Sequence, residues 1–186
     1  MRAFETEKTE VAEIDRSVYD IKDKVNAAFE VNSGLTAEIV EQISKEKHDP
    51  DWMREFRLKA LDIYNKASIP NWGPSLEGLD MRNIVTYVRP NTEMRGKWSE
   101  VPDDIKNTFE RLGIPQAERS SLAGVGAQYD SEVVYHNVKE EVAAQGVVYT
   151  DMESALTGPY ADMVKEHFMK CVPPTDHKFA ALHGAV

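Results

Sequence analysis

The stretch that most constrains the fold is Ser121-Leu-Ala-Gly-Val-Gly-Ala-Gln-Tyr-Asp-Ser-Glu-Val-Val-Tyr-His-Asn137. Two glycines, Gly124 and Gly126, punctuate its first half, which is typical of a loop. The β-branched and aromatic side chains of Val133-Val-Tyr135 in its second half favour a strand. The sequence therefore predicts a glycine loop at 124–126 that leads into a strand at 132–136.

The spacing Gly124-x-Gly126 also resembles the start of a nucleotide-binding fingerprint. That fingerprint needs a small residue three positions after its second glycine, and it follows a strand and opens a helix. Tyr129 stands at the required position, and these glycines precede a strand instead of following one. The pattern indicates a tight chain reversal and not a phosphate site.

Outside this stretch, the clearest pattern is that of two amphipathic helices. Thr36 is suited to cap a helix that ends near Lys45-Glu-Lys47, and the apolar residues of that helix share one face. Asp49-Pro50 predicts a second start, with Asp49 as the cap and Pro50 at the first helical position. The second helix is predicted to bury a stripe of Trp52, Phe56, Ala60 and Ile63, flanked by Met53, Leu61 and Tyr64, and to expose Arg54, Arg57 and Asp62.

The remaining elements are predicted to be short. In chain order they are a strand at 84–88, helices at 102–112, 115–122 and 138–145, a strand at 147–150, a helix at 152–156 capped by Asp151, a helix from Pro159 that ends at Pro173-Pro174, and an apolar tail at 177–186. The tail has no terminating signal, so we expect it to pack against something further along. The fold class predicted is α+β, helix-rich with a few short strands.

Composition excludes several classes of function. The net charge of −10, from 32 acids and 22 bases, disfavours binding to nucleic acid. No apolar run approaches the roughly 18 residues of a membrane span, and the first residues contain no signal-peptide core. We therefore expect a cytoplasmic protein without a membrane partner. The single cysteine, Cys171, excludes an internal disulfide and falls short of the about four thiolates of an ordinary iron–sulfur site.

Residues 1–33 are rich in acids and contain neither Pro nor Gly. They are predicted to form a mobile acidic arm. A frayed helix from Val11 to Val31, formed on contact with a partner, is the alternative.

The only cluster of histidine and cysteine lies near the carboxyl end. His167 and Cys171 are four apart on a predicted helix and are weak candidates for metal ligands, with His177 and His183 close behind. Two ligands do not make a tetrahedral site, so structural roles are the favoured interpretation. The alternatives are a transfer route for iron or sulfide, or a Cys171 nucleophile with His167 as its base. Trp72, between Pro70 and Pro74, is a candidate anchor between segments.

From about Gly34 to Val186 the chain resembles the amino-terminal part of the SufB/SufD family, the scaffold proteins of the SUF iron–sulfur cluster assembly system. The resemblance rests on Trp52-Met-Arg-Glu-Phe-Arg-Leu-Lys-Ala60, Pro70-Asn-Trp-Gly-Pro74, Val101-Pro102, Phe109-Glu-Arg-Leu-Gly-Ile-Pro115, Ala123–Asn137, Asp151-Met152 and Lys178-Phe-Ala-Ala-Leu182. Beyond the acidic arm at 1–33, which composition predicts, it implies a helical or α+β domain at 34–172 and, at 173–186, the start of a connection to a β-helix that this chain lacks.

The resemblance also implies function. It implies a scaffold that assembles clusters with a SufC-like ATPase, a SufD-like subunit, and a cysteine desulfurase with its sulfur carrier. The cluster itself is built on the missing β-helix, so we expect no catalytic, cofactor-binding or metal residues in this segment and no catalysis by the isolated chain. The alternative is a stand-alone interaction or metal-handling module that uses the His167/Cys171 tail.

Overall fold

The computed structural model describes residues 27–73, 75–113, 122 and 124–186. The helices are α1 (Ala37–Glu46), α2 (Asp51–Lys66), α3 (Asp103–Arg111), α5 (Glu140–Ala143), α6 (Met152–Thr157), α7 (Ala161–His167) and α8 (Lys178–Ala185), with short 3₁₀ turns at Met81–Asn83 and Trp98–Glu100. The strands are β1 (Ala27–Glu30), β2 (Val88–Pro90), β3 (Gly124–Tyr129) and β4 (Glu132–Val138). The strands pair as β1–β2 and β3–β4, both antiparallel, and the described residues contain no β-helix. The α+β, helix-rich prediction is confirmed.

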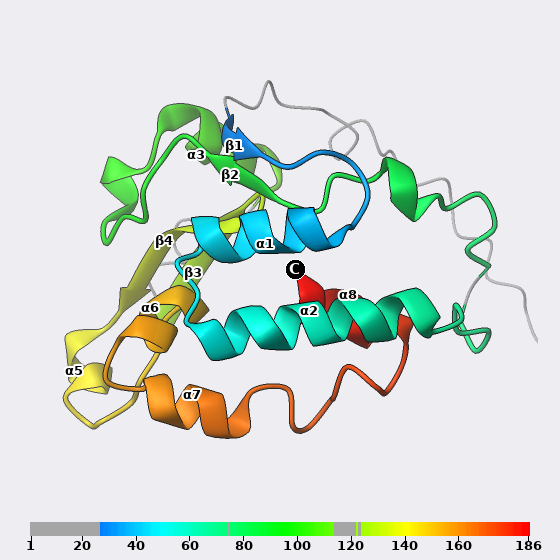
Figure 1. The fold of residues 1–186 in the computed structure, drawn as a ribbon. Coiled ribbons are helices and arrows are strands. Elements are labelled where there is room, and N and C mark those ends of the chain that lie inside the picture. The colour runs from blue at the N-terminus through cyan, green and yellow to red at the C-terminus, as the bar shows by residue number, and fades with distance from the viewer. Residues whose placement is uncertain (1–26, 74, 114–121, 123) are drawn as a thin grey trace, which may run out of the picture.

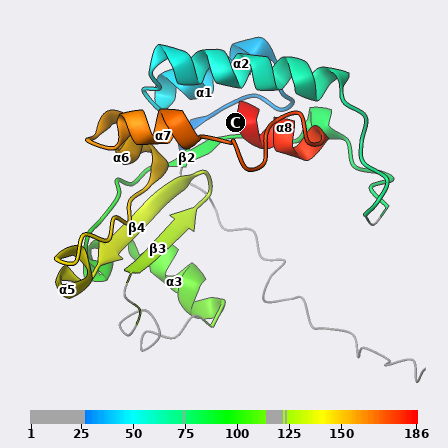
Figure 2. The ribbon, with the colours of Figure 1, turned by 90° about the horizontal axis from the view of Figure 1, so that it is seen from below.

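The molecule has a helical layer and a hairpin unit. Figures 1 and 2 show α1 and α2 side by side with α8 beneath α2, while the β3–β4 hairpin and α3 extend away from these helices. The helical layer buries one cluster from α1, α2 and α8, which consists of Val40, Ala60, Leu61, Tyr64, Ala181 and Ala185. The hairpin unit buries a second, which consists of Val101, Ile105, Ala127, Val134 and Tyr135. Each unit therefore has its own small core.

Helix α1 forms where the sequence predicts it. The Thr36 hydroxyl accepts a hydrogen bond from the Ile39 backbone N–H at 3.3 Å, which satisfies a free donor of the first turn. Ile39, Val40 and Ile43 are buried on one face, as predicted.

Helix α2 departs from its predicted orientation. Its buried residues are Met53, Arg57, Ala60, Leu61 and Tyr64, whereas Trp52, Phe56 and Ile63 are only partly buried. Arg57, predicted to be exposed, points inward because Asp49 lies there to pair with it at 2.6 Å. Asp49 is therefore not the helix cap; Pro50 holds that position with an extended ψ of 155°.

The β1–β2 pair corrects the prediction for the amino-terminal arm. Ala27–Glu30 is a strand in this chain, where the alternative prediction had a helix formed on contact with a partner, and the earlier part of that segment lies outside the described residues. Phe29 packs against Tyr87 with 6.1 Å between ring centroids, and the pair joins a third buried cluster with α1. Residues 27–30 are thus part of the fold and not of an arm. The strand predicted at 84–88 lies instead at Val88–Pro90, with an isolated bridge from Val85 to Ser33.

The β3–β4 hairpin corrects the predicted glycine loop. Gly124 and Gly126 lie in β3, where they pair with Val138 and His136. The reversal comes later, at Asp130-Ser131, where Asp130 has a φ of 53° in the left-handed region that Asp tolerates. The strand predicted at 132–136 is confirmed as β4, but 147–150 is not a strand.

The other short elements agree with the sequence in part. Helix α3 starts after Pro102 and ends before Gly113, whose φ of 76° suits a helix stop. Asp151 caps α6 by accepting a hydrogen bond from the Ser154 N–H at 2.8 Å. The helix predicted at 138–145 shortens to α5, and the one predicted at 115–122 lies outside the described residues, apart from Leu122.

The apolar tail forms helix α8, which packs within the chain. Ala181 and Ala185 are fully buried against α2, and Gly184 approaches Ala60 so closely that a Cβ would lie 3.1 Å from the Ala60 methyl. The tail thus already packs within this chain, and the expectation that it also packs against something further along stays a prediction.

Candidate functional site

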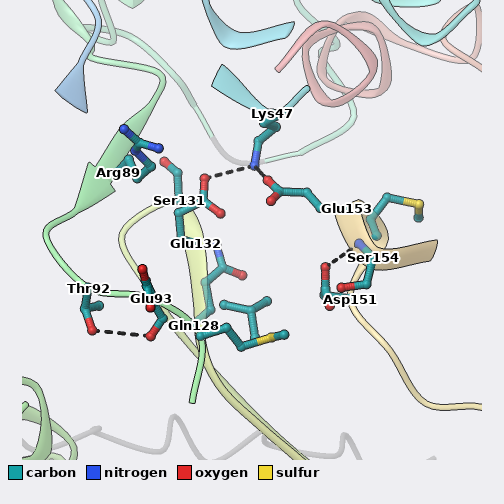
Figure 3. A pocket seen from close by; sticks show the side chains of 13 residues that line it. Lys47, Arg89, Thr92, Glu93, Gln128, Ser131, Glu132, Asp151, Glu153 and Ser154 are labelled. Atoms are coloured by element: carbon teal, nitrogen blue, oxygen red, sulfur yellow. Dashed lines mark hydrogen bonds and ion pairs between the residues drawn. The ribbon is translucent and has the colours of Figure 1, made fainter. Parts of the chain in front are cut away.

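A charged cleft of about 430 Å³ lies where the helical layer meets the hairpin (Figure 3). The end of α1, the segment after β2, the hairpin turn and the first turn of α6 form its walls. Its lining residues are Lys47, Arg89, Thr92, Glu93, Met94, Gln128, Ser131, Glu132, Val133, Asp151, Met152, Glu153 and Ser154. The cleft is therefore shared by segments that are far apart in the sequence.

Lys47 is the central cation of the cleft. It follows α1 directly, and its Nζ lies 2.6 Å from Glu153 Oε1 and 3.1 Å from Glu132 Oε1 (Figure 3). The same ammonium lies 5.0 Å from the centre of the Tyr87 ring. The side chains of Lys47 and Glu132 are only 16% and 17% exposed, so this interaction is shielded from water far more than a surface ion pair.

Tyr87 is the third partner of this group, since it contacts both Glu132 and Lys47. Its hydroxyl donates a short hydrogen bond to Glu132 Oε1. Burial raises the pKa of Tyr87 far above its ordinary value, and the bond to Glu132 adds to the shift, so the hydroxyl stays a donor at neutral pH. Burial likewise raises the pKa of Glu153, against the opposing effect of Lys47.

The hairpin turn is tied to β2 next to these side chains. The Ser131 hydroxyl accepts from the Val88 N–H at 3.0 Å, and the Ser131 N–H donates to the Val88 carbonyl at 3.1 Å. Arg89 at the same edge pairs with Glu46 of α1 at 3.1 Å. These contacts fix the hairpin unit to the helical layer.

Three of the four carboxyl groups that line the cleft, those of Glu132, Asp151 and Glu153, make such contacts. Glu132 and Glu153 share Lys47, while hydrogen bonds from Ser154 lower the pKa of Asp151 even though burial, the largest single effect, raises it. Met94 and Met152 at the rim are about half exposed, which gives a charged centre an apolar border of the kind that protein contacts use.

The structure does not bring His167 and Cys171 together on a helix. Helix α7 ends at His167, Phe168 has an extended ψ of 122°, and Met169 has a φ of 47°. The i,i+4 geometry assumed for the pair is therefore wrong. Within the ranges described, no three His, Cys, Asp or Glu side chains gather to hold a metal ion.

The other candidates from the sequence have structural neighbours. A Cβ on Gly124 or Gly126 would lie 3.0 Å from the Tyr149 side chain, and the Tyr149 ring stacks on His136 at 4.7 Å. The two glycines make room for an aromatic ring and form no phosphate loop. Trp72 does contact another segment, since its ring meets that of His177 edge-on at 5.6 Å, but it remains 73% exposed.

Sequence reasoning missed the cleft itself. Lys47 lies 85 positions from Glu132 and 106 from Glu153, and each is an ordinary charged residue on a predicted surface. No local pattern marks them. A helix long and apolar enough to span a bilayer is also not found in the described ranges.

Comparison with known proteins gives consistent relatives. The chain is 50% identical over 168 residues to the iron–sulfur cluster assembly protein SufB of Bacillus subtilis, and 46% identical over 168 residues to a SufBD family protein of Staphylococcus haemolyticus. Each alignment covers 90% of this chain and 36% of the relative. A Mycobacterium tuberculosis SufBD family protein is 43% identical over 182 residues, which cover 97% of this chain and 21% of that protein. No family model matches the chain, and no solved structure matches it.

Proposed function

We propose that this chain acts in iron–sulfur cluster assembly as the amino-terminal portion of a SufB-like scaffold. The premise is that it is a homologue of SufBD-family iron–sulfur cluster assembly proteins. The observation that carries the proposal is the identity of 50% over 90% of the chain. The chain spans about a third of the length of the first relatives it matches, so the activity of the whole protein is part of the proposal.

Its mode of action would be protein–protein docking. One cysteine in 186 residues falls well short of the about four thiolates of an ordinary cluster, so this segment would contribute a surface and not ligands. The cluster is then the cargo of the complete scaffold. We expect the segment to work in the cytoplasm and without catalysis of its own.

We propose the rim of the charged cleft as the docking surface. The paired charges of Lys47, Glu132 and Glu153 give the surface a fixed shape, and the exposed methionines Met94 and Met152 offer adaptable apolar contacts beside them. The expected partners are a SufD-like subunit and a SufC-like ATPase, with a cysteine desulfurase and its sulfur carrier acting on the complete scaffold.

A binding assay tests the docking surface. The chain is immobilised and titrated with purified SufD-like and SufC-like proteins. Met152→Asp should weaken binding at least about tenfold, because it places a charge in an apolar contact. Met163→Asp on α7 is the matched control, since Met163 is as exposed as Met152 but does not line the cleft. Equal affinities for both variants would exclude the cleft rim, and a wild-type chain that binds none of these proteins would contradict docking altogether.

Anaerobic reconstitution with iron and sulfide tests the claim that the segment holds no cluster. We expect the chain to acquire no stable visible absorbance. Stable absorbance that disappears in Cys171→Ser would overturn that claim and favour the alternative, a metal-handling module built on the His167/Cys171 tail. That alternative assumed that His167 and Cys171 lie on one helix, but α7 ends at His167.

A further inference from the structure

Helix α8 begins with an unusual cap. The Nδ1 atom of His177 accepts hydrogen bonds from the backbone N–H groups of Phe179 and Ala180, both at 3.1 Å. An imidazole nitrogen accepts only when it carries no proton, so this cap requires the neutral ring with its proton on Nε2. The state of one titratable side chain therefore decides whether the first turn of α8 is capped.

The next residue anchors the same turn to α2. Lys178 Nζ donates to the backbone carbonyls of Tyr64 at 2.6 Å and Ala67 at 2.9 Å, and it lies 4.1 Å from the centre of the Tyr64 ring. It thereby satisfies carbonyls at the end of α2 that have no partner within that helix. The cap and the anchor are adjacent in sequence, so we expect loss of the first to loosen the second.

Behind this turn lies the largest cluster of the helical layer. Ala181 and Ala185 of α8 are fully buried against Ala60, Leu61 and Tyr64. An opening of α8 at its first turn would expose the α2 side of this cluster.

Protonation of His177 reverses the chemistry of the cap. Nδ1 would become a donor facing two donors, and a positive charge would lie at the positive end of the helix dipole. Lys178 adds a second positive charge beside it. The opposing group is Asp176, whose carboxylate lies 3.8 Å from Nε2 but is more than half exposed. The other groups near His177 add no net charge. On α2, Tyr64 is neutral, and Lys66 and Asp62 pair with each other at 2.6 Å. The Trp72 ring that contacts His177 is uncharged.

We propose that His177 is a proton-operated latch that holds α8 on α2 while its ring is neutral and releases the first turn of α8 when it is protonated. Histidine is the side chain whose charge ordinarily changes between pH 5 and 8. The His177 side chain is 28% exposed, and protons reach it without unfolding of the chain.

Hydrogen exchange on the full 186-residue chain tests the latch. The opening constant of the α8 amides is measured at pH 7.5 and pH 5.5, with the intrinsic pH effect on exchange removed. The wild type should open about fivefold more at pH 5.5, the effect of losing one cap. His177→Asn and His177→Asp keep a side-chain acceptor that does not titrate in this range, so their opening constants should stay constant.

His183→Asn is the matched control, because His183 lies exposed on the same helix and contacts no cap. It should retain the wild-type response. The latch would be overturned if the wild-type opening constant did not change with pH. It would also be overturned if whichever of the two His177 variants folds kept the wild-type increase in opening at pH 5.5. If His183→Asn lost the pH dependence of α8 opening, that dependence would belong to His183 and not to His177, and the proposal would be overturned as well.

Discussion

Lys47 Nζ lies 2.6 Å from Glu153 Oε1 and so connects the end of α1 to the first turn of α6 across 106 positions of sequence. The two units of the molecule have separate cores, and this ion pair lies at the junction between them. Because Lys47 also reaches Glu132 at the hairpin, one ammonium joins three elements. The junction should therefore respond to single substitutions more strongly than exposed ion pairs do.

Replacing Lys47 by Met should lower the free energy of unfolding by about 1–2 kcal/mol, because it leaves the shielded carboxylate of Glu132 and the partly exposed carboxylate of Glu153 without their cation. Urea denaturation of the chain measures the change. Lys66→Met is the control: its pair with Asp62 is exposed and should be worth about 0.5 kcal/mol or less. Equal losses in the two variants would show that the junction is no stronger than a surface pair.

Glu153 should titrate above its ordinary pKa of 4.5, because burial disfavours its charged form. A raised pKa in the folded state means that Glu153 favours folding at low pH and that this contribution is lost as the pH rises through the folded pKa. Carbon-13 NMR of the side-chain carboxyl measures the midpoint directly. Lys47→Met should raise it further and Glu132→Gln should lower it; shifts in the opposite directions would contradict the electrostatic account.

Helix α1 shows what local sequence can predict. Its cap at Thr36 and its apolar period act within a few residues, so the structure confirms both. Helix α2 shows the limit of the same reasoning. Its existence follows from local periodicity, but its rotation depends on Arg57, which is buried only because Asp49 is held beside it.

The hairpin and the cleft depend on contacts that no short pattern records. Gly124 and Gly126 favour a loop by composition, yet they lie in a strand because β3 pairs with β4, and their lack of side chains leaves room for Tyr149. Lys47, Glu132 and Glu153 meet only once the hairpin has docked on α1. The fold class was therefore accessible from the sequence, whereas the candidate site was not.

Replacing Arg57 by Met should destabilise the chain by about 3 kcal/mol. The substitution strands Asp49, whose side chain is fully buried and has no other partner for its ionised form among the described residues. Arg54→Met on the same helix is the matched control, since its pair with Glu41 is exposed and should be worth well under about 1 kcal/mol. Thermal or urea unfolding of both variants gives the comparison. A double variant, Asp49→Asn with Arg57→Met, should recover part of the loss because it removes the stranded charge.

Replacing Gly126 by Ala should cost about 1–3 kcal/mol, because its Cβ would lie 3.0 Å from the Tyr149 hydroxyl oxygen, inside van der Waals contact. The next nearest Tyr149 atom is 3.9 Å away, so the conflict is with the hydroxyl alone. Tyr149→Phe should therefore rescue Gly126→Ala in a double-mutant cycle measured by urea denaturation. Gly96→Ala, where a Cβ would meet nothing within 4 Å, is the control and should change stability by less than about 0.5 kcal/mol. Additive effects of the two substitutions would mean that the Tyr149 hydroxyl does not contact Gly126. They would then also contradict the explanation that the glycines of β3 make room for Tyr149.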